Sequence, residues 1–139
     1  MFLYSLKQFN RLLSTVDTCI KLRPNAHDLY LTAGILHEKV GDTVSSKSYF
    51  TKSLKICNSV LDTMKTSDRD YAMVTTNKAI NLIMLGDSAQ ANEILENLYK
   101  TQPDDPQFDN VEKKYTLSLM NKSKAQLIDT LTNQENYSR

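Results

Sequence analysis

The chain has 139 residues, 40% hydrophobic and 24% charged, which is enough for one domain with a buried core. Seventeen basic and sixteen acidic residues leave a net charge of +1, so charge alone attracts the chain to neither nucleic acid nor an anionic membrane. Three glycines, three prolines and no run of alternating β-branched residues leave little room for sheets. We therefore expect an all-α fold and no nucleic-acid partner.

The two cysteines, Cys19 and Cys57, are too few and too far apart for a disulfide framework or a zinc site. We interpret them as buried or half-buried thiols. The opening FLYSL is interrupted by Lys7 and Arg11, which makes it a poor signal peptide, and no later stretch approaches the ~18 apolar residues of a membrane span. The expected protein is soluble and cytoplasmic, unless the chain belongs to a longer one.

Near the N-terminus, apolar residues recur every three or four positions and so lie on one helical face: Leu6, Phe9, Leu13, Val16 and Ile20. We expect this helix to end near Leu22, before Pro24.

A helical hairpin follows, with Gly41 and Asp42 at its turn. Asn25 is the expected N-cap of the first helix, which should run from Ala26 to Val40. Gly41 can adopt a left-handed C-terminal conformation, and Asp42 can cap the second helix. That helix carries one uninterrupted apolar stripe and is expected to reach about Lys65: Phe50, Leu54, Cys57, Leu61 and Met64.

Ser67 is the expected cap of the next helix, which ends at a second Gly-Asp turn, Gly86 and Asp87. Its inward face should carry Tyr71, Thr75, Ala79 and Leu82. Asp105 and Pro106 predict the start of a further helix, with Phe108, Val111, Tyr115 and Leu119 on one face. Leu127, Ile128 and Leu131 indicate a last capping helix.

The first hairpin resembles a tetratricopeptide repeat, in which small and aromatic residues occupy set places in two helices. The matching residues here are Tyr30, Ala33, Gly34, His37, Ser46 and Phe50, and a later hairpin contributes Ala91, Leu95 and Pro103. The resemblance implies a right-handed superhelix of antiparallel helical hairpins, an α-solenoid. The two Gly-Asp turns lie further apart than the repeat length of about 34 residues, so the second helix should be unusually long.

On this basis the whole chain, 1–139, is one repeat domain in five parts. Residues 1–24 form an incomplete repeat, with 1–6 as the stub of a missing helix, and 25–66 form a repeat with an extended second helix. Residues 67–104 form another repeat, 105–134 a degenerate repeat or capping helices, and 135–139 a frayed tail. The chain is therefore expected to begin inside a repeat.

No motif predicts an enzyme, a metal site or a cofactor: the chain has no G-x-S-x-G elbow, P-loop, G-x-G-x-x-G or H-E-x-x-H. His27 and His37 are interpreted as a surface and a packing residue. A basic group of Lys113, Lys114, Lys122 and Lys124 lies beside acidic residues, so we interpret it as a solvated helix face and not as an RNA site.

In tetratricopeptide repeats the first helices line a concave groove that receives a peptide or helix, so the resemblance implies a non-enzymatic interaction module or scaffold. The matching apolar floor is Leu31, Ile35, Ile80, Ile83 and Met84, with Met73, Thr76 and Asn77 beside it and Glu38, Lys39, Asp109 and Lys113 at the rim. Only Asn77 matches the family subset that clamps a C-terminal carboxylate. The expected partner is therefore an apolar or amphipathic peptide; the alternative is a structural segment of a longer repeat protein or a self-associating domain.

Overall fold

The computed structural model describes residues 6–132 and places them in seven α-helices and one 3₁₀ helix, with no strand in this range. The helices are α1 (Leu6–Leu22), α2 (His27–Lys39), α3 (Thr43–Leu61), α4 (Tyr71–Met84), α5 (Ser88–Thr101), η1 (Pro106–Phe108), α6 (Val111–Leu119) and α7 (Lys124–Thr132). The prediction of an all-α chain is confirmed for this range. The expected stub before residue 6 and the tail 135–139 lie outside the described residues.

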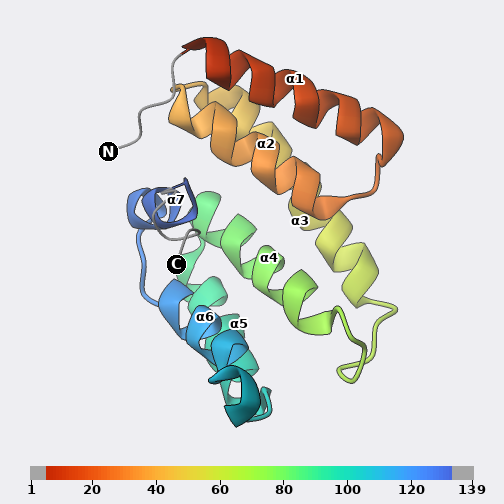
Figure 1. Cartoon of the computed structure of the whole chain (residues 1–139), viewed down its shortest axis with the longest axis vertical. Coiled ribbons are helices and arrows are strands. Elements are labelled where there is room, and N and C mark those ends of the chain that lie inside the picture. Colours follow the sequence, from red (N-terminus) through yellow and green to blue (C-terminus); the bar gives the residue numbers. More distant parts are fainter. Residues whose placement is uncertain (1–5, 133–139) are drawn as a thin grey trace.

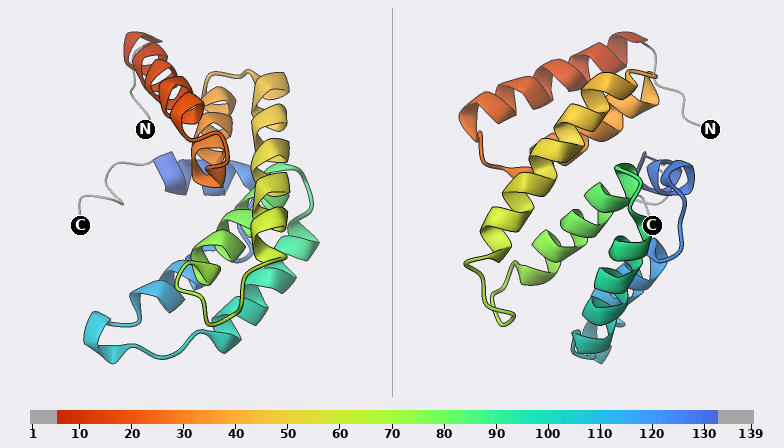
Figure 2. Two further views of the ribbon diagram at one scale, coloured as in Figure 1. Left: turned by 90° about the vertical axis from the view of Figure 1, so that its right-hand side faces the viewer. Right: turned by 180° about the vertical axis from the view of Figure 1, so that it is seen from behind.

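Each α-helix from α1 to α5 packs against the next α-helix along the chain, and α2 also contacts α4. In Figure 1, α2, α4 and α6 lie on the near side, while α3 and α5 lie behind them. Figure 2 shows the reverse view, with α3 and α5 in front. The odd- and even-numbered helices from α2 to α6 therefore form two layers, and α2 and α4 are neighbours in one of them.

Both glycine turns form as predicted. Gly41 and Gly86 have φ values of +83° and +96°, a left-handed conformation that glycine adopts without steric cost. The side chain of Asp42 accepts a hydrogen bond from the Ser45 N–H, and Asp87 caps α5 through the Gln90 N–H in the same way. In both hairpins a left-handed glycine therefore ends the first helix and a capping aspartate begins the second.

Two other predicted caps are wrong. The N-cap of α2 is Ala26 and makes no side-chain hydrogen bond, because the chain forms a backbone turn there in which the Ala26 N–H donates to the Arg23 carbonyl. α4 begins at Tyr71, well after Ser67, and Asp68 instead accepts a hydrogen bond from the Lys65 N–H. α3 ends at Leu61 and not near Lys65 as predicted. Residues 62–70 form a segment that connects α3 to α4.

The helix predicted from Pro106 is interrupted. Asp109 and Asn110 both adopt left-handed conformations, with φ of 56° and 52°, so η1 ends and α6 begins only at Val111. The break rotates the face expected to point inward. Leu119 is fully buried, but Phe108 and Val111 are 63% and 59% exposed, and Tyr115 is also exposed.

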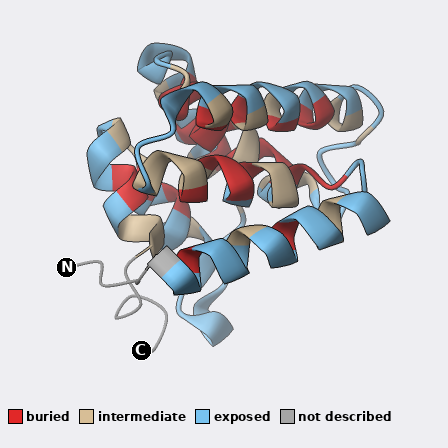
Figure 3. Ribbon diagram, turned by 90° about the horizontal axis from the view of Figure 1, so that it is seen from above, coloured by how far each residue is buried: buried red, intermediate tan, exposed pale blue. Residues whose placement is uncertain are grey.

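The N-terminal helix packs as its periodicity predicts. Phe9 and Val16 are buried against Ala33 and Leu36 of α2, while the outward side of α1 is exposed, as Figure 3 shows from above.

Both cysteines are free, with Cys19 half-buried and Cys57 buried. This confirms their interpretation as buried or half-buried thiols.

Close packing of the first hairpin depends on Gly34. The main core holds the fully buried ring of Phe50 from α3, and this ring lies directly over Gly34 in α2. Ser46, the other small residue at the crossing, is also buried. The two helices can therefore approach each other where the sequence places residues with little or no side chain.

Candidate protein-interaction surface

The five apolar residues predicted as a groove floor lie on adjacent sides of α2 and α4, and we call this surface the α2–α4 face. Its members are Leu31, Ile35, Ile80, Ile83 and Met84, and they belong to one hydrophobic cluster. They do not line an open groove, which corrects that expectation. Ile80 is only 1% exposed; Leu31, Ile83 and Met84 are also buried, and Ile35 is half-buried.

The C-terminal helix α7 contributes to this burial, together with buried residues of α3, α5 and α6 in the same cluster. Leu127 is 0% exposed, and it joins Ile128 and the half-buried Leu131 in the same cluster as the α2–α4 face. Figure 1 places α7 beside the C-terminal end of α4 and below the C-terminal end of α2. An amphipathic helix of the chain itself therefore packs against part of the surface that the sequence predicts to be open.

An ion pair fixes α7 at the edge of this face. One carboxylate oxygen of Glu38 accepts a hydrogen bond from the Ser46 hydroxyl at 2.6 Å, and the other lies 3.1 Å from Nζ of Lys124. Burial raises the pKa of Glu38, but the Ser46 hydrogen bond and the hydrogen bond and charge of Lys124 outweigh it, so the pKa lies below its usual value. Glu38 is therefore ionised at neutral pH, with a partner on each oxygen.

Polar residues connect α2, α3 and α4 beside the apolar cluster. Asn77 lies 3.1 Å from Nδ1 of His27, and Asn81 donates a hydrogen bond to the Ser53 hydroxyl, which in turn donates to the His27 carbonyl. His27 is buried, so its interpretation as a surface residue is wrong. Burial lowers the pKa of His27, although Asp28 opposes the change, and the ring is therefore neutral near pH 7.

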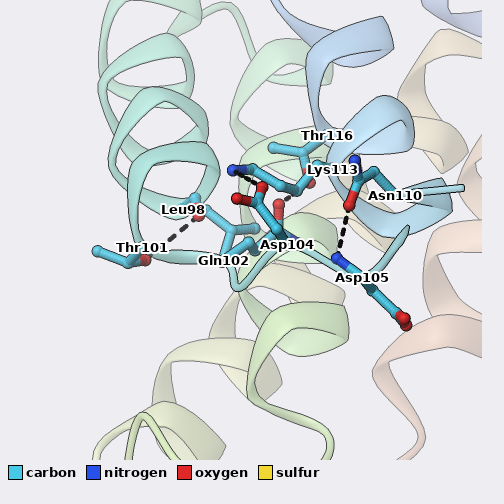
Figure 4. Close-up of polar contacts among 8 residues, drawn as sticks. All are labelled: Leu98, Thr101, Gln102, Asp104, Asp105, Asn110, Lys113 and Thr116. Atoms are coloured by element: carbon cyan, nitrogen blue, oxygen red, sulfur yellow. Dashed lines mark hydrogen bonds and ion pairs between the residues drawn. The ribbon is translucent and has the colours of Figure 1, made fainter. Parts of the chain in front are cut away.

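The predicted rim residues Asp109 and Lys113 lie at a different corner, where α5 meets α6. Figure 4 shows Lys113 paired with Asp104 at 3.0 Å in this corner, and the Lys113 ammonium also lies 5.0 Å from the centre of the Tyr99 ring. Asp109 pairs with Lys114. These contacts hold the α5–α6 connection together, so the two residues do not border the α2–α4 face.

The remaining predicted residues are divided between surface and interior. Met73, near the start of α4, is exposed, and Thr76 is buried. Lys39 and Asn77 are half-buried, with Asn77 engaged by His27. The structure thus brings together the five floor residues and Glu38, and separates them from Met73, Asp109 and Lys113.

Sequence reasoning missed two features of the structure, one at the α2–α4 face and one away from it. The spacing of Leu127, Ile128 and Leu131 predicted a capping helix, but periodicity does not say which surface such a helix covers. The second is a cavity of about 940 Å³ between the end of α3, the 62–70 segment, the start of α4 and the end of α5. The unusual length between the two Gly-Asp turns was its only signal, since the extra residues form one of its walls.

The Cys57 thiol lies in the protein interior and is fully buried. Burial raises the pKa of the Cys57 thiol to about 11, so it is protonated at neutral pH and a poor nucleophile. No three histidine, cysteine or acidic side chains lie close enough to hold a metal ion anywhere in residues 6–132.

None of the helices described has the length and apolar character needed to cross a membrane. Comparisons of the chain with protein-family models, with curated proteins and with solved structures give no match.

Proposed function

We propose that the chain is a non-enzymatic protein-interaction module similar to tetratricopeptide repeats, with its hairpins arranged as a right-handed superhelix, and that it binds a helical segment of a partner on the α2–α4 face. The observation that carries this proposal is that the face already accepts an amphipathic helix. Leu127 of α7 is fully buried in the same cluster as this face, although the described part of α7 has only nine residues.

The energetics of this contact suit recognition of a helix. Burying an aliphatic side chain is worth about 1.5–3 kcal/mol, so Leu127, Ile128 and Leu131 together supply several kcal/mol before the cost of ordering. The Lys124–Glu38 pair sets the orientation of the bound helix, because it holds the N-terminal end of that helix near the end of α2. An apolar face with one charged contact therefore selects an amphipathic helix in one orientation.

An alternative is that the chain is a structural segment of a longer repeat protein or associates with itself. The exposed apolar side chains on η1 and α6 favour this alternative, since Phe108, Val111 and Leu117 are each more than half exposed. Sedimentation of the chain over a concentration series separates the two functions. A monomer at all concentrations argues against self-association.

The proposal is tested by opening the face and offering it a helix in trans. Asp129 is exposed near the middle of α7, so Asp129→Pro should break the helix without removing an apolar contact residue. Asp129→Ala is the matched control, since it keeps α7 helical. A fluorescent peptide of residues 121–132 should bind the Asp129→Pro chain saturably in an anisotropy titration. If that chain keeps its remaining helical circular dichroism and still fails to bind the peptide, the proposed function is wrong.

A further inference from the structure

α7 has its own N-terminal cap and packs on the rest of the protein through its side chains. It has a reciprocal cap of its own: the Ser123 N–H donates to Oε1 of Gln126, and the Gln126 N–H donates to the Ser123 hydroxyl. In the segment before it, Asn121 is left-handed with φ of 59°, and its N–H donates to Oδ1 of Asn92 in α5. The start of the helix is therefore specified locally, whereas its position is set by the face against which it packs.

We infer that α7 is an intramolecular ligand that competes with the partner for the α2–α4 face, and that the partner is a helix with the same pattern of side chains as α7. This inference rests on the proposed function. The pattern is a cation with apolar residues three, four and seven residues after it. In α7 these residues are Lys124, Leu127, Ile128 and Leu131.

The cation in this pattern follows from the surroundings of Glu38. The Glu38 side chain is 16% exposed, and one of its carboxylate oxygens already accepts a hydrogen bond from Ser46. A helix that displaced α7 without supplying a cation would leave the other oxygen next to apolar surface and poorly solvated, which is unfavourable for an ionised group. Partner helices with Lys or Arg at this position are therefore selected over neutral ones.

Displacement is feasible because the nine described residues of α7 form fewer than three helical turns. Helices of fewer than about 12 residues are marginal in water, so α7 depends on the face for its structure. Its attachment to α6 by the short 120–123 segment gives it an effective concentration of about millimolar at the face. A longer partner helix that makes the same contacts can bind tightly enough to displace α7 despite this effective concentration. Without the partner, α7 stays packed on the apolar surface.

The experiment measures binding of the labelled 121–132 peptide to three 139-residue chains: the native chain, Asp129→Pro and Asp129→Ala. Because the tethered helix competes, we expect the peptide to bind the Asp129→Pro chain at least tenfold more tightly than the native chain. The Asp129→Ala chain should behave like the native chain. Equal affinity for the native and Asp129→Pro chains would show that α7 does not compete, which overturns this inference while the proposed function stands.

The cation is tested with peptide variants on the Asp129→Pro chain. A peptide with Lys124→Ala should bind several-fold more weakly, whereas Ala125→Ser, at an exposed position, should have little effect. In a chain that also carries Glu38→Gln, the loss from Lys124→Ala should disappear. If Lys124→Ala binds as well as the native peptide, the inferred partner pattern is wrong.

Hydrogen exchange on the native chain provides a measurement that does not depend on a variant. Saturating peptide should speed exchange of the amides of residues 124–132 and leave α3 and α5 protected. Unchanged protection of α7 in the presence of bound peptide overturns the competition.

Discussion

Replacing Gly34 by alanine should destabilise the protein, against the usual effect of this change in a helix. In an exposed helix interior, Gly→Ala stabilises by roughly 0.5–1 kcal/mol. Here the new Cβ would lie 2.5 Å from Cε1 and 2.6 Å from Cδ1 of Phe50, well inside van der Waals contact. The Phe50 ring is fully buried in the main core, so it cannot move away without disturbing its neighbours.

Overpacking of this kind typically costs about 1–3 kcal/mol, which exceeds the gain in helix propensity. We therefore expect Gly34→Ala to lower the free energy of unfolding by about 1 kcal/mol or more. Urea unfolding followed by circular dichroism should show a lower midpoint with an unchanged slope.

A double-mutant cycle with Phe50→Leu isolates the contact. In the Phe50→Leu background the smaller side chain leaves room for the Cβ, so Gly34→Ala should become neutral or stabilising by up to about 1 kcal/mol. If Gly34→Ala stabilises the native chain by the ordinary helix-propensity amount, the ring does not pack on Gly34 and the reasoning about this hairpin is refuted.

Two further predictions concern the neighbouring helix interface. Ile80→Asp places a carboxylate in a site that is only 1% exposed, so cooperative unfolding should be lost, whereas Ile80→Val should cost only about 0.5–1.5 kcal/mol; a folded Ile80→Asp chain would show that the site is open. Burial lowers the pKa of His27 from its ordinary 6.5, so the unfolded state binds this proton more readily. The His27 contribution to stability is therefore fully present above pH 6.5 and is lost as the pH falls through the lower folded-state pKa. The difference in unfolding free energy between the native chain and a non-titrating His27→Gln chain should follow this trend, and a difference independent of pH would contradict it.

Local signals in the sequence determined much of the helical framework. Gly41 with Asp42 and Gly86 with Asp87 mark turns correctly because a left-handed glycine and a capping carboxylate act within a few residues. The N-terminal helix could be predicted because its apolar stripe is regular and only one side of it is covered. Where backbone turns replaced side-chain caps, as at Asn25 and Ser67, the predicted boundaries were wrong.

The tertiary structure decided which apolar surfaces are covered. Periodicity places Ile80 and Ile83 on α4 but does not distinguish a groove floor from a core, because both are apolar. The answer depends on segments distant in sequence, since residues of α5, α6 and α7 join the α2–α4 face in one buried cluster. Conversely, the left-handed pair Asp109 and Asn110 turned Phe108 and Val111 outward although their spacing predicted burial. Helix formation depends on local interactions, whereas covering a face depends on where a distant segment packs, and only the folded chain contains that information.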